Sequence, residues 1–211
     1  MIQGIIIEGL STAGKTSLLS ALKKVHSQTP NVQRTMISVS EHYSQVLHQD
    51  HGQLRSMQQN EHIELLKLHV DYLELLHNWN YSLGHTNLTS GVFYILERFH
   101  LNHRGAYGSS TEIEALEQRL SKLNAQCVLL TLSPDAVEPR FIVSRGEDWK
   151  SYILKDHSSV TEACEKFLAD QEKLRTCAKQ SLVPMMEINT DNAEWEDYGR
   201  QLLTKLIGAS L

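Results

Sequence analysis

The chain has 211 residues, a mass of 24.0 kDa and a formal net charge of −5 at neutral pH. Hydrophobic residues make up 41% of it and charged residues 21%, which excludes a disordered low-complexity chain and a basic nucleic-acid coat protein. The cysteines form no CxxC pair, and no apolar stretch reaches the ~18 residues of a membrane span. We therefore expect one large cytoplasmic domain over residues 1–211, with no nucleic-acid or membrane partner.

Apolar runs and helical stretches alternate along the whole chain. The apolar runs have the short, often β-branched character of buried strands, and they cover residues 2–7, 34–39, 92–96, 126–132 and 184–188. Helical patterns follow them at residues 17–26 and 61–81, from residue 111, and at residues 159–179 and 191–207. This alternation predicts an α/β fold with a mainly parallel sheet and helices on both faces.

Three expected helix starts carry capping patterns, in which an acidic residue follows three positions after a hydroxyl or acidic residue. The patterns begin at Thr111, Ser159 and Asp191. Between the regular elements, residues 42–60, 100–110 and 146–158 show weaker patterns. We expect these stretches to be loops that bind substrate, with a lid at about residues 140–158.

The long helical stretch at residues 61–81 is apolar on more than one side. One apolar set can face the core, and a second set follows the same helical spacing. The second set is Leu65, Leu68, Tyr72, Leu75 and Trp79. The pattern indicates either burial within the protomer or the face of a homodimer. For Tyr72 and Trp79 we favour a core role over contact with an aromatic base.

The strongest motif is a glycine-rich loop directly after the first expected strand. Residues 9–16 read Gly-Leu-Ser-Thr-Ala-Gly-Lys-Thr and match GxxxxGK[ST] at every fixed position. Glycines let successive backbone N–H groups turn towards phosphate oxygens, and the following helix adds its positive N-terminal dipole. We expect Lys15 to contact the β- and γ-phosphates of a nucleotide and Thr16 to bind Mg²⁺.

Other phosphate-loop classes lack their own signatures here. A GTPase needs an NKxD motif and a DxxG switch, and an ABC-type ATPase needs an LSGGQ-like sequence, and none of these occurs. The fourth expected strand ends without the acidic residue of a Walker B site. Small-molecule kinases can dispense with that arrangement, so they are the class that these absences favour.

Residues 5–17 resemble the opening of thymidylate kinases and deoxynucleoside kinases, which carry Glu-Gly before the loop and a second hydroxyl residue after it. Glu97-Arg98 resembles their (D/E)R motif. Ser133-Pro134-Asp135, followed by Arg140 and Arg145, is similar to their helix and arginine-rich lid. The resemblance implies a phosphate-loop fold with a five-stranded parallel sheet in the strand order 2-3-1-4-5.

The chain departs from the thymidylate kinase pattern at three points. Ser11 stands where aspartate is usual, and Thr12 stands where glycine is usual. The lid keeps two arginines but lacks the third basic residue. An unusual substrate or slow catalysis would be consistent with these departures.

Candidate site residues follow from the motif, the sheet edge and the resemblance. Phosphoryl transfer depends mostly on positioning and charge stabilisation. Ligands of open parallel sheets bind at the carboxyl ends of the strands, where Glu41, Glu97 and Arg98 follow expected strands. The resemblance implies that Glu41 accepts a proton from an acceptor hydroxyl, and we expect Glu97 to orient Mg²⁺-bound water. The residues expected to bind the nucleotide are Gly9, Leu10, Ser11, Thr12, Ala13, Gly14, Lys15, Thr16 and Ser17. The residues expected to act in catalysis are Lys15, Glu41, Arg98, Arg140 and Arg145, and those expected to bind the acceptor are Glu41, Tyr43, Arg55, Arg98, Arg104 and Tyr107. The residues expected to bind the metal are Thr16 and Glu97.

The sequence thus predicts a kinase that uses ATP and Mg²⁺ to phosphorylate a nucleoside or a nucleoside monophosphate. Two alternatives remain open at this point. One is a phosphate-loop kinase of another small hydroxyl compound, and the other is a non-catalytic nucleotide-binding regulatory module.

Overall fold

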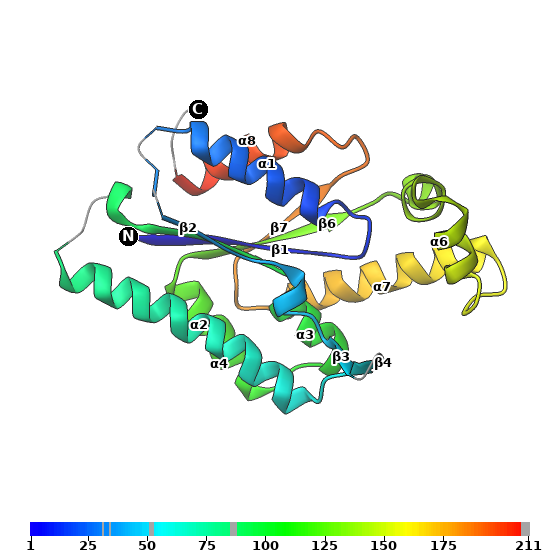
Figure 1. Cartoon of the computed structure of the whole chain (residues 1–211), viewed down its shortest axis with the longest axis horizontal. Coiled ribbons are helices and arrows are strands. Elements are labelled where there is room, and N and C mark those ends of the chain that lie inside the picture. The colour runs from blue at the N-terminus through cyan, green and yellow to red at the C-terminus, as the bar shows by residue number, and fades with distance from the viewer. Residues whose placement is uncertain (31, 34, 51–52, 85–87, 208–211) are drawn as a thin grey trace.

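The computed structural model describes residues 1–30, 32–33, 35–50, 53–84 and 88–207. Its main sheet consists of parallel strands, namely β1 (Ile2–Gly9), β2 (Thr35–Val39), β5 (Val92–Glu97), β6 (Ala125–Thr131) and β7 (Met185–Asn189). Their order across the sheet is β2-β5-β1-β6-β7. Numbered without the separate β3–β4 pair, these strands run in the expected order 2-3-1-4-5 (Figure 1). Residue 34 of the expected second strand and residues 51–52 of the expected loop lie outside the described residues.

Helices cover both faces of this sheet. The helices of the described residues are α1 (Lys15–Gln28), α2 (Gln59–Ser82), α3 (His100–Tyr107), α4 (Thr111–Lys122), α5 (Pro134–Val137), α6 (Gly146–Ile153), α7 (Val160–Gln180) and α8 (Trp195–Ile207). Helices α1 and α8 lie together on one face, and α2, α3, α4 and α7 lie on the other (Figure 1). Among the described residues, no helix combines the length and the apolar character needed to cross a membrane.

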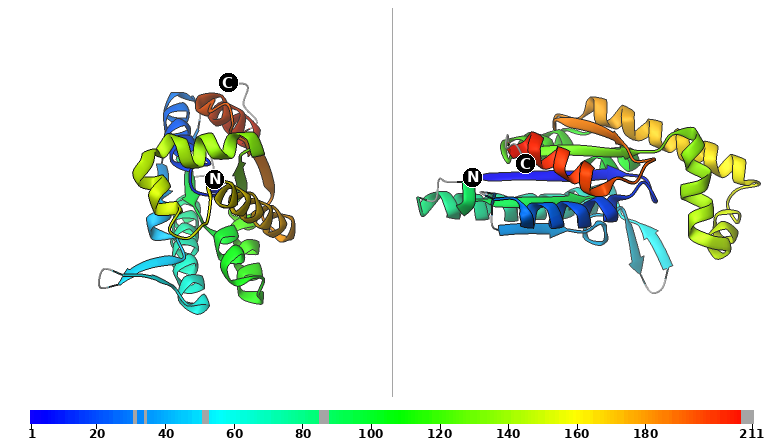
Figure 2. Two further views of the ribbon diagram at one scale, coloured as in Figure 1. Left: turned by 90° about the vertical axis from the view of Figure 1, so that its right-hand side faces the viewer. Right: turned by 90° about the horizontal axis from the view of Figure 1, so that it is seen from above.

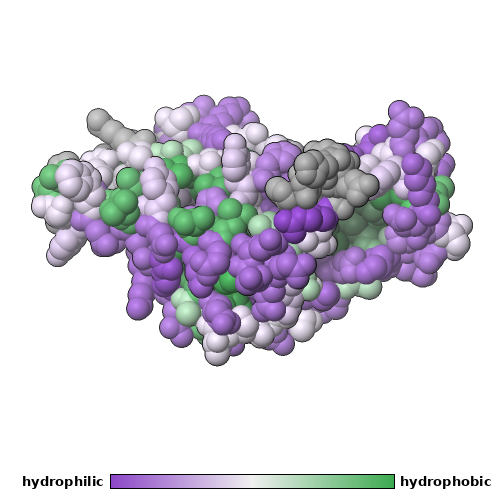
Figure 3. Space-filling model, turned by 60° about the horizontal axis from the view of Figure 1, so that its bottom comes forward, coloured by the Kyte–Doolittle hydropathy of each residue, from purple (hydrophilic) through white to green (hydrophobic). Residues whose placement is uncertain are grey.

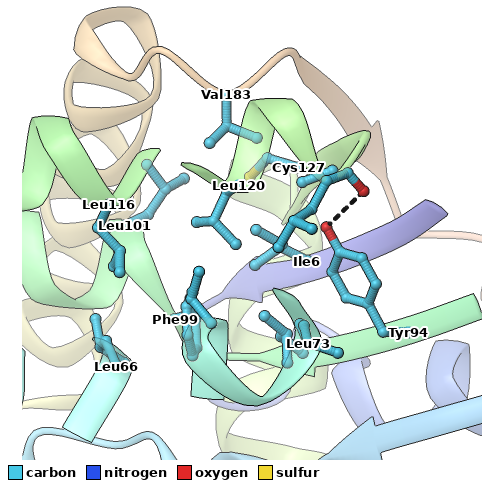
Figure 4. Packing of buried hydrophobic residues seen from close by; sticks show 14 of the residues in the cluster. Ile6, Leu66, Leu73, Tyr94, Phe99, Leu101, Leu116, Leu120, Cys127 and Val183 are labelled. Carbon is cyan, nitrogen blue, oxygen red and sulfur yellow. Dashed lines mark hydrogen bonds between the residues drawn. The ribbon is translucent and has the colours of Figure 1, made fainter. Parts of the chain in front are cut away.

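The core has one layer on each side of the sheet because side chains alternate along a strand. Along β1, Ile2 and Ile6 join the layer that contains α2 and α4, whereas Ile5 and Ile7 join the layer that contains α1 and α8. Figure 4 shows the first layer, where the hydroxyl of Tyr94 donates a hydrogen bond of 3.3 Å to the carbonyl of Leu123, directly after α4. Both layers continue to the carboxyl ends of the strands, so the strand ends that carry the site rest on a packed scaffold.

Two of the expected loops contain regular structure. Residues 100–110, expected to be a loop, mostly form α3, because the buried carboxylate of Glu8 accepts hydrogen bonds from the backbone N–H groups of Phe99 (3.0 Å) and Leu101 (2.9 Å) at the start of that helix. Residues 42–60 contain a hairpin of β3 (Leu47–Asp50) and β4 (Gln53–Ser56). The capping partner of α3 is remote in sequence, so a local pattern does not reveal this helix.

The capping patterns are confirmed in part. Ser159 caps α7 as expected, because its side chain accepts a hydrogen bond from the backbone of Glu162. The cap of α4 is Ser110 and not Thr111, one residue earlier than expected. Asp191 does not cap α8. Its carboxylate accepts a hydrogen bond of 3.0 Å from the backbone of Ser133.

The stretch expected to be the lid begins directly after β6. Helix α5 continues into a π-helical turn at Glu138–Ile142 and a 3-10 turn at Val143–Arg145, and α6 follows. Figure 2 shows this segment standing beyond the ends of the strands, at the same end of the molecule as the loop that follows β1. Residues 146–158 are therefore partly helical, contrary to the expectation of a loop.

Candidate active site

The glycine-rich loop joins β1 to α1 and takes the backbone conformation that its glycines allow. Gly9 and Gly14 have φ values of 142° and 98°, in the region that L-amino acids with a side chain rarely adopt. A Cβ atom on Gly14 would lie 2.0 Å from the ring of Trp195, so this position also has no room for a side chain. Thr12, which stands where thymidylate kinases usually have glycine, has a φ of 70° and carries the strain that glycine avoids.

Lys15 lies at the first position of α1, directly after this loop, and is 6% exposed. Its ammonium group donates a hydrogen bond of 3.1 Å to the carbonyl of Leu10 and lies 3.4 Å from a carboxylate oxygen of Glu41. Burial lowers the pKa of Lys15 to about 8, and nearby Arg98 lowers it further while Glu41 opposes the shift. The lysine is therefore a buried cation whose charge depends on its acidic neighbours.

Arg98 joins Lys15 and Glu41 at the sheet edge. Its Nε lies 3.1 Å from the same Glu41 oxygen that faces Lys15, and its Nη2 donates a hydrogen bond of 2.9 Å to the hydroxyl of Ser11. Arg98 has a φ of 51°, an unusual conformation for a residue with a side chain, and such strained positions cluster at functional sites. Ser11, the other departure from the thymidylate kinase pattern, is thus part of the arginine's support.

Glu97 completes what we call the sheet-edge cluster, which consists of Lys15, Glu41, Glu97 and Arg98. The Oε2 atom of Glu97 accepts a hydrogen bond of 3.3 Å from the backbone N–H of Glu41. The Oε1 atom of Glu97 is buried and has no hydrogen-bond partner among the described residues. Burial raises the pKa of Glu97, and the neighbouring Glu41 carboxylate adds to this effect. The cluster brings together side chains from the ends of β2 and β5 and from the start of α1.

The oxygen donors present suit Mg²⁺. The unpartnered carboxylate oxygen of Glu97 is a hard ligand without a proton donor, and Thr16 contributes a hydroxyl to the cavity beside the loop. Mg²⁺ prefers such oxygens and keeps several waters when it accompanies phosphates. The donor set therefore fits a magnesium ion that arrives with a nucleotide.

A cavity of about 430 Å³ lies between the glycine-rich loop and the lid. The residues that line it are Ser11, Thr12, Gly14, Lys15, Thr16, Ser17, Glu41, Arg140, Ser144 and Arg145. Ligand sites have volumes of roughly 300–1,000 Å³, so this cavity is large enough to hold a small ligand. It combines the loop's backbone, one buried cation and both lid arginines.

Both lid arginines reach this cavity because the helix changes type between them. Arg140 lies in the π-helical turn and Arg145 in the 3-10 turn, so they do not point apart as they would on one straight helix. Arg140 donates hydrogen bonds to the carbonyls of Thr190 (2.9 Å) and Thr12 (3.4 Å). Arg145 lies over the ring of Trp149, with 4.1 Å between the guanidinium carbon and the ring centroid.

A second cavity, of about 290 Å³, borders the sheet-edge cluster at Arg98. Its lining is Leu10, Gln45, Val46, Arg98, Asn102, Gly105, Ala106, Asp170, Lys173 and Leu174. The side-chain nitrogen of Asn102 is buried and has no hydrogen-bond partner among the described residues. Arg98 borders this cavity and pairs with Glu41, which borders the first, so the cluster connects the two.

Four residues expected at the acceptor line neither cavity. Arg104 is buried in an ion pair with Glu117, with 2.6 Å between Nε and Oε1, because α3 directs it towards α4. Tyr107 donates a hydrogen bond of 2.5 Å to the carbonyl of Met57. The other two are Arg55, which pairs with Glu61 at 3.2 Å, and Tyr43, which is 68% exposed.

Sequence reasoning named Leu10 and Arg98 but missed the other residues that line the second cavity. Asn102 and Gln45 are uncharged polar side chains in stretches without a motif, and Lys173 is one of three lysines on α7. The one available signal was position, because Asn102 follows Arg98 by four residues. That signal becomes informative only once residues 100–107 are known to be helical.

Comparison with known proteins gives structural matches without sequence relatives. No protein-family model and no curated protein sequence matches the chain. Among solved structures, it is similar to the YorR protein of Bacillus subtilis in complex with phosphorylated GDP, with a TM-score of 0.59 and 12% identity over 97% of this chain and 96% of YorR. Other matches are shikimate kinase from Bacteroides thetaiotaomicron (TM-score 0.45, 15% identity, 99% and 100% coverage) and thymidylate kinase from Candida albicans (TM-score 0.49, 13% identity, 98% and 91% coverage).

The likeness to YorR extends over nearly the whole of both chains. Together with the strand order β2-β5-β1-β6-β7, it shows that this chain has the same α/β fold, with a five-stranded parallel sheet between helices. The expected fold class is therefore confirmed.

Proposed function

We propose that this protein transfers the γ-phosphoryl group of ATP to a nucleoside or a nucleoside monophosphate. The observation that carries the proposal is the sheet-edge cluster, in which Lys15 faces the cavity beside the glycine-rich loop and Arg98 faces a second cavity. A kinase needs two adjacent sites, one for each substrate, with positive charge between them. The geometry supports a donor site in the first cavity and an acceptor site in the second.

In this proposal, each charged residue has one task. Backbone N–H groups of residues 9–16 and the ammonium of Lys15 hold the phosphate chain. Arg98 holds the acceptor against the transferring group, and Glu41 accepts the proton of an acceptor hydroxyl. Thr16 would hold a bound Mg²⁺ directly and Glu97 would hold it through a water, and the ion would supply positive charge that neutralises the phosphates.

The lid residues would act on the other side of the phosphates. We propose that residues 140–158 close over the donor site and that the whole chain forms one catalytic domain. Arg145 is well placed for this role, since it lines the donor cavity and is stacked on Trp149 without a carboxylate partner among the described residues. A guanidinium supplied in this way stabilises negative charge in the transition state and excludes water.

An acceptor panel tests the proposal. ADP release from ATP and Mg²⁺ is measured alone, with each of the common nucleosides and nucleoside monophosphates, and with unrelated alcohols. We expect one of the nucleosides or nucleoside monophosphates to stimulate release at least tenfold. Stimulation only by unrelated alcohols would move the assignment to a kinase of another hydroxyl compound. Tight ATP binding without stimulation by any acceptor would move it to a regulatory module.

The second cavity offers an internal control for the same assay. Asn102→Asp keeps the size of the side chain but replaces the unpartnered amide nitrogen, so it should raise the KM for the acceptor about tenfold and leave the KM for ATP unchanged. Equal effects on both KM values would contradict an acceptor site in this cavity.

A further inference from the structure

Helix α2 has one side in the core and one side exposed. Tyr72 is 52% exposed and Trp79 is 65% exposed, so the core role expected for these two residues is wrong, because their side of the helix faces away from the sheet. Figure 3, which brings the bottom of the molecule in Figure 1 forward, shows apolar side chains among hydrophilic ones. The buried residues of α2 are His62, Ile63, Leu66, Val70 and Leu73. His62 alone among these is polar, and a buried polar side chain needs hydrogen-bond partners.

Both ring nitrogens of His62 have such partners. Its Nε2 lies 2.8 Å from the carbonyl oxygen of Ser44, and its Nδ1 lies 2.9 Å from the Nδ1 of His103 on α3. Both histidines are fully buried. The ring planes differ by 9° and the ring centroids lie 5.2 Å apart, which is close to the nitrogen separation plus the two ring radii. The rings therefore meet edge to edge across the hydrogen bond.

The partners of His62 fix the position of the proton on each ring. A carbonyl oxygen only accepts, so Nε2 of His62 carries the proton. Neutral His62 then has an acceptor at Nδ1, and His103 donates from its own Nδ1. Burial lowers the pKa of both histidines, that of His103 to about 4, so both rings are neutral near pH 7. The donors therefore follow one direction, from His103 through His62 to Ser44.

Ser44 extends this chain of hydrogen bonds to the sheet-edge cluster. It is buried and directly follows the 3-10 turn Glu41–Tyr43. Its hydroxyl donates a hydrogen bond to the carbonyl of Glu97, and its backbone N–H donates one of 3.2 Å to the carbonyl of Glu41. The turn that begins with Glu41 is thus held by the end of β5 and, through Ser44, by His62.

We propose that His62 is a positioning residue, which holds this turn so that the Glu41 carboxylate stays beside Lys15 and Arg98. The inference rests on the proposed function, in which that carboxylate accepts the proton of the acceptor. Glu41 needs such support because it follows β2, the edge strand of the main sheet, and its side chain is 31% exposed. His103 is the neighbour of Asn102, which lines the second cavity, so the acceptor site and its base share one support.

Two amide side chains at position 62 form a matched pair. In His62→Gln the amide nitrogen lies close to the position of Nε2 and can donate to Ser44. In His62→Asn the side chain is one methylene shorter, reaches only the position of Nδ1 and leaves the Ser44 carbonyl unpaired. We expect His62→Asn to lower kcat with the best acceptor about tenfold and to leave the KM for ATP unchanged, and His62→Gln to recover most of this loss. Equal kcat values in the two variants would overturn the inference.

Nitrogen-15 NMR of the histidine-labelled native chain tests the hydrogen-bond chain without catalysis. Long-range spectra should show the proton of His62 on Nε2 and that of His103 on Nδ1. The other tautomer at either residue, or a cationic His62 at pH 7, would contradict the proposed chain.

Hydrogen exchange tests whether His62 holds the turn. The backbone N–H of Gln45 donates a hydrogen bond of 2.9 Å to the carbonyl of Glu41 and reports on this turn. It should exchange at least about tenfold faster in His62→Asn than in His62→Gln. Equal exchange would show that His62 does not hold the turn.

These measurements separate the inference from the proposed function. The other tautomers or equal exchange, found together with turnover that an acceptor stimulates, would overturn the inference alone. The expected tautomers and exchange, found without stimulation by any acceptor, would overturn the proposed function and with it the catalytic role of the turn.

Discussion

The sheet-edge cluster and the lid hold their cations in different ways. In the cluster, Lys15 and Arg98 are fixed by a shared carboxylate, that of Glu41, and by groups of the glycine-rich loop. In the lid, Arg140 and Arg145 lie over the rings of Trp195 and Trp149. Charges that a packed sheet holds in place are preorganised for the reaction. Charges on a segment beyond the sheet can move when that segment moves.

This difference separates two contributions to phosphoryl transfer. The cluster would set the geometry of the phosphates before the reaction, and the lid would add charge and exclude water once the nucleotide is bound. Substitutions in the two regions should therefore have different signatures, and the predictions below are ordered from the largest expected effect to the smallest.

Removal of the cluster's lysine should have the largest effect. Lys15→Ala should lower turnover about 100- to 1,000-fold, because a buried cation aimed at the phosphates would be lost. Lys24→Ala is the control on the same helix, since Lys24 is exposed and bonded to Glu196. ADP release in the presence of the best acceptor measures both. Equal turnover in the two variants would mean that the cluster is not the site of transfer.

The buried carboxyl group beneath the cluster should make stability depend on pH. Burial raises the pKa of Glu8 from its ordinary 4.5 to about 7. Its protonated form is therefore favoured by folding, and this contribution is complete below pH 4.5 and lost as the pH rises through about 7. The pKa difference corresponds to about 3 kcal/mol of unfolding free energy.

Glu8→Gln tests this prediction, because an uncharged amide oxygen can still accept the hydrogen bonds of Phe99 and Leu101. Urea unfolding between pH 5 and pH 8 should show a decline in stability for the native chain that the variant lacks. The same slope in both proteins would assign the pH dependence to other groups.

The two lid arginines should differ from each other. Arg145→Ala should lower turnover about tenfold and leave the melting temperature unchanged, since Arg145 has no hydrogen-bonded carboxylate among the described residues. Arg140→Ala should also lower the unfolding free energy by about 2 kcal/mol, because two hydrogen bonds tie Arg140 to the carbonyls of Thr12 and Thr190.

Calorimetric melting and ADP release together check this difference. The account expects Arg140, with its two hydrogen bonds to backbone carbonyls, to stabilise the fold and Arg145 not to. A loss of stability in Arg145→Ala, or an unchanged stability in Arg140→Ala, would contradict this difference.

The strained threonine of the loop should give the smallest effect. Thr12→Gly should raise the unfolding free energy by about 0.5 kcal/mol, because glycine adopts a φ of 70° without the penalty that a side chain brings. Gly14→Ala is the opposite case and should destabilise the protein, since its Cβ would clash with Trp195. Urea denaturation measures both. A destabilising Thr12→Gly would show that the threonine side chain contributes more than its strain costs.

The sequence was sufficient to predict the sheet and the glycine-rich loop. Both depend on local properties: apolar runs at residues 2–7 and 126–132 form β1 and β6 because they are buried on both faces, and GxxxxGK[ST] has a fixed spacing. The sheet-edge residues Glu41, Glu97 and Arg98 were also predictable, because strand ends lie at one edge of a parallel sheet.

The second cavity and the outward face of α2 were not predictable in the same way. Helix α3 starts at a cap that Glu8 provides from about ninety residues away. On this helix, Arg104 points towards Glu117 of α4 and Tyr107 points towards Met57, so neither side chain faces a ligand. Which of two apolar sides of α2 meets the core depends on where α4 and the sheet lie. Long-range placement of this kind has no local signal.

Isothermal titration calorimetry of the full chain with ATP and Mg²⁺ tests the central claim most directly, because it measures nucleotide binding without any assumption about the acceptor. The account predicts one site per chain in the native protein, with binding that weakens at least about 100-fold in Lys15→Ala and is unchanged in Lys24→Ala. No heat from the native protein, or equal heat from the native protein and Lys15→Ala, would contradict a phosphate site at the glycine-rich loop.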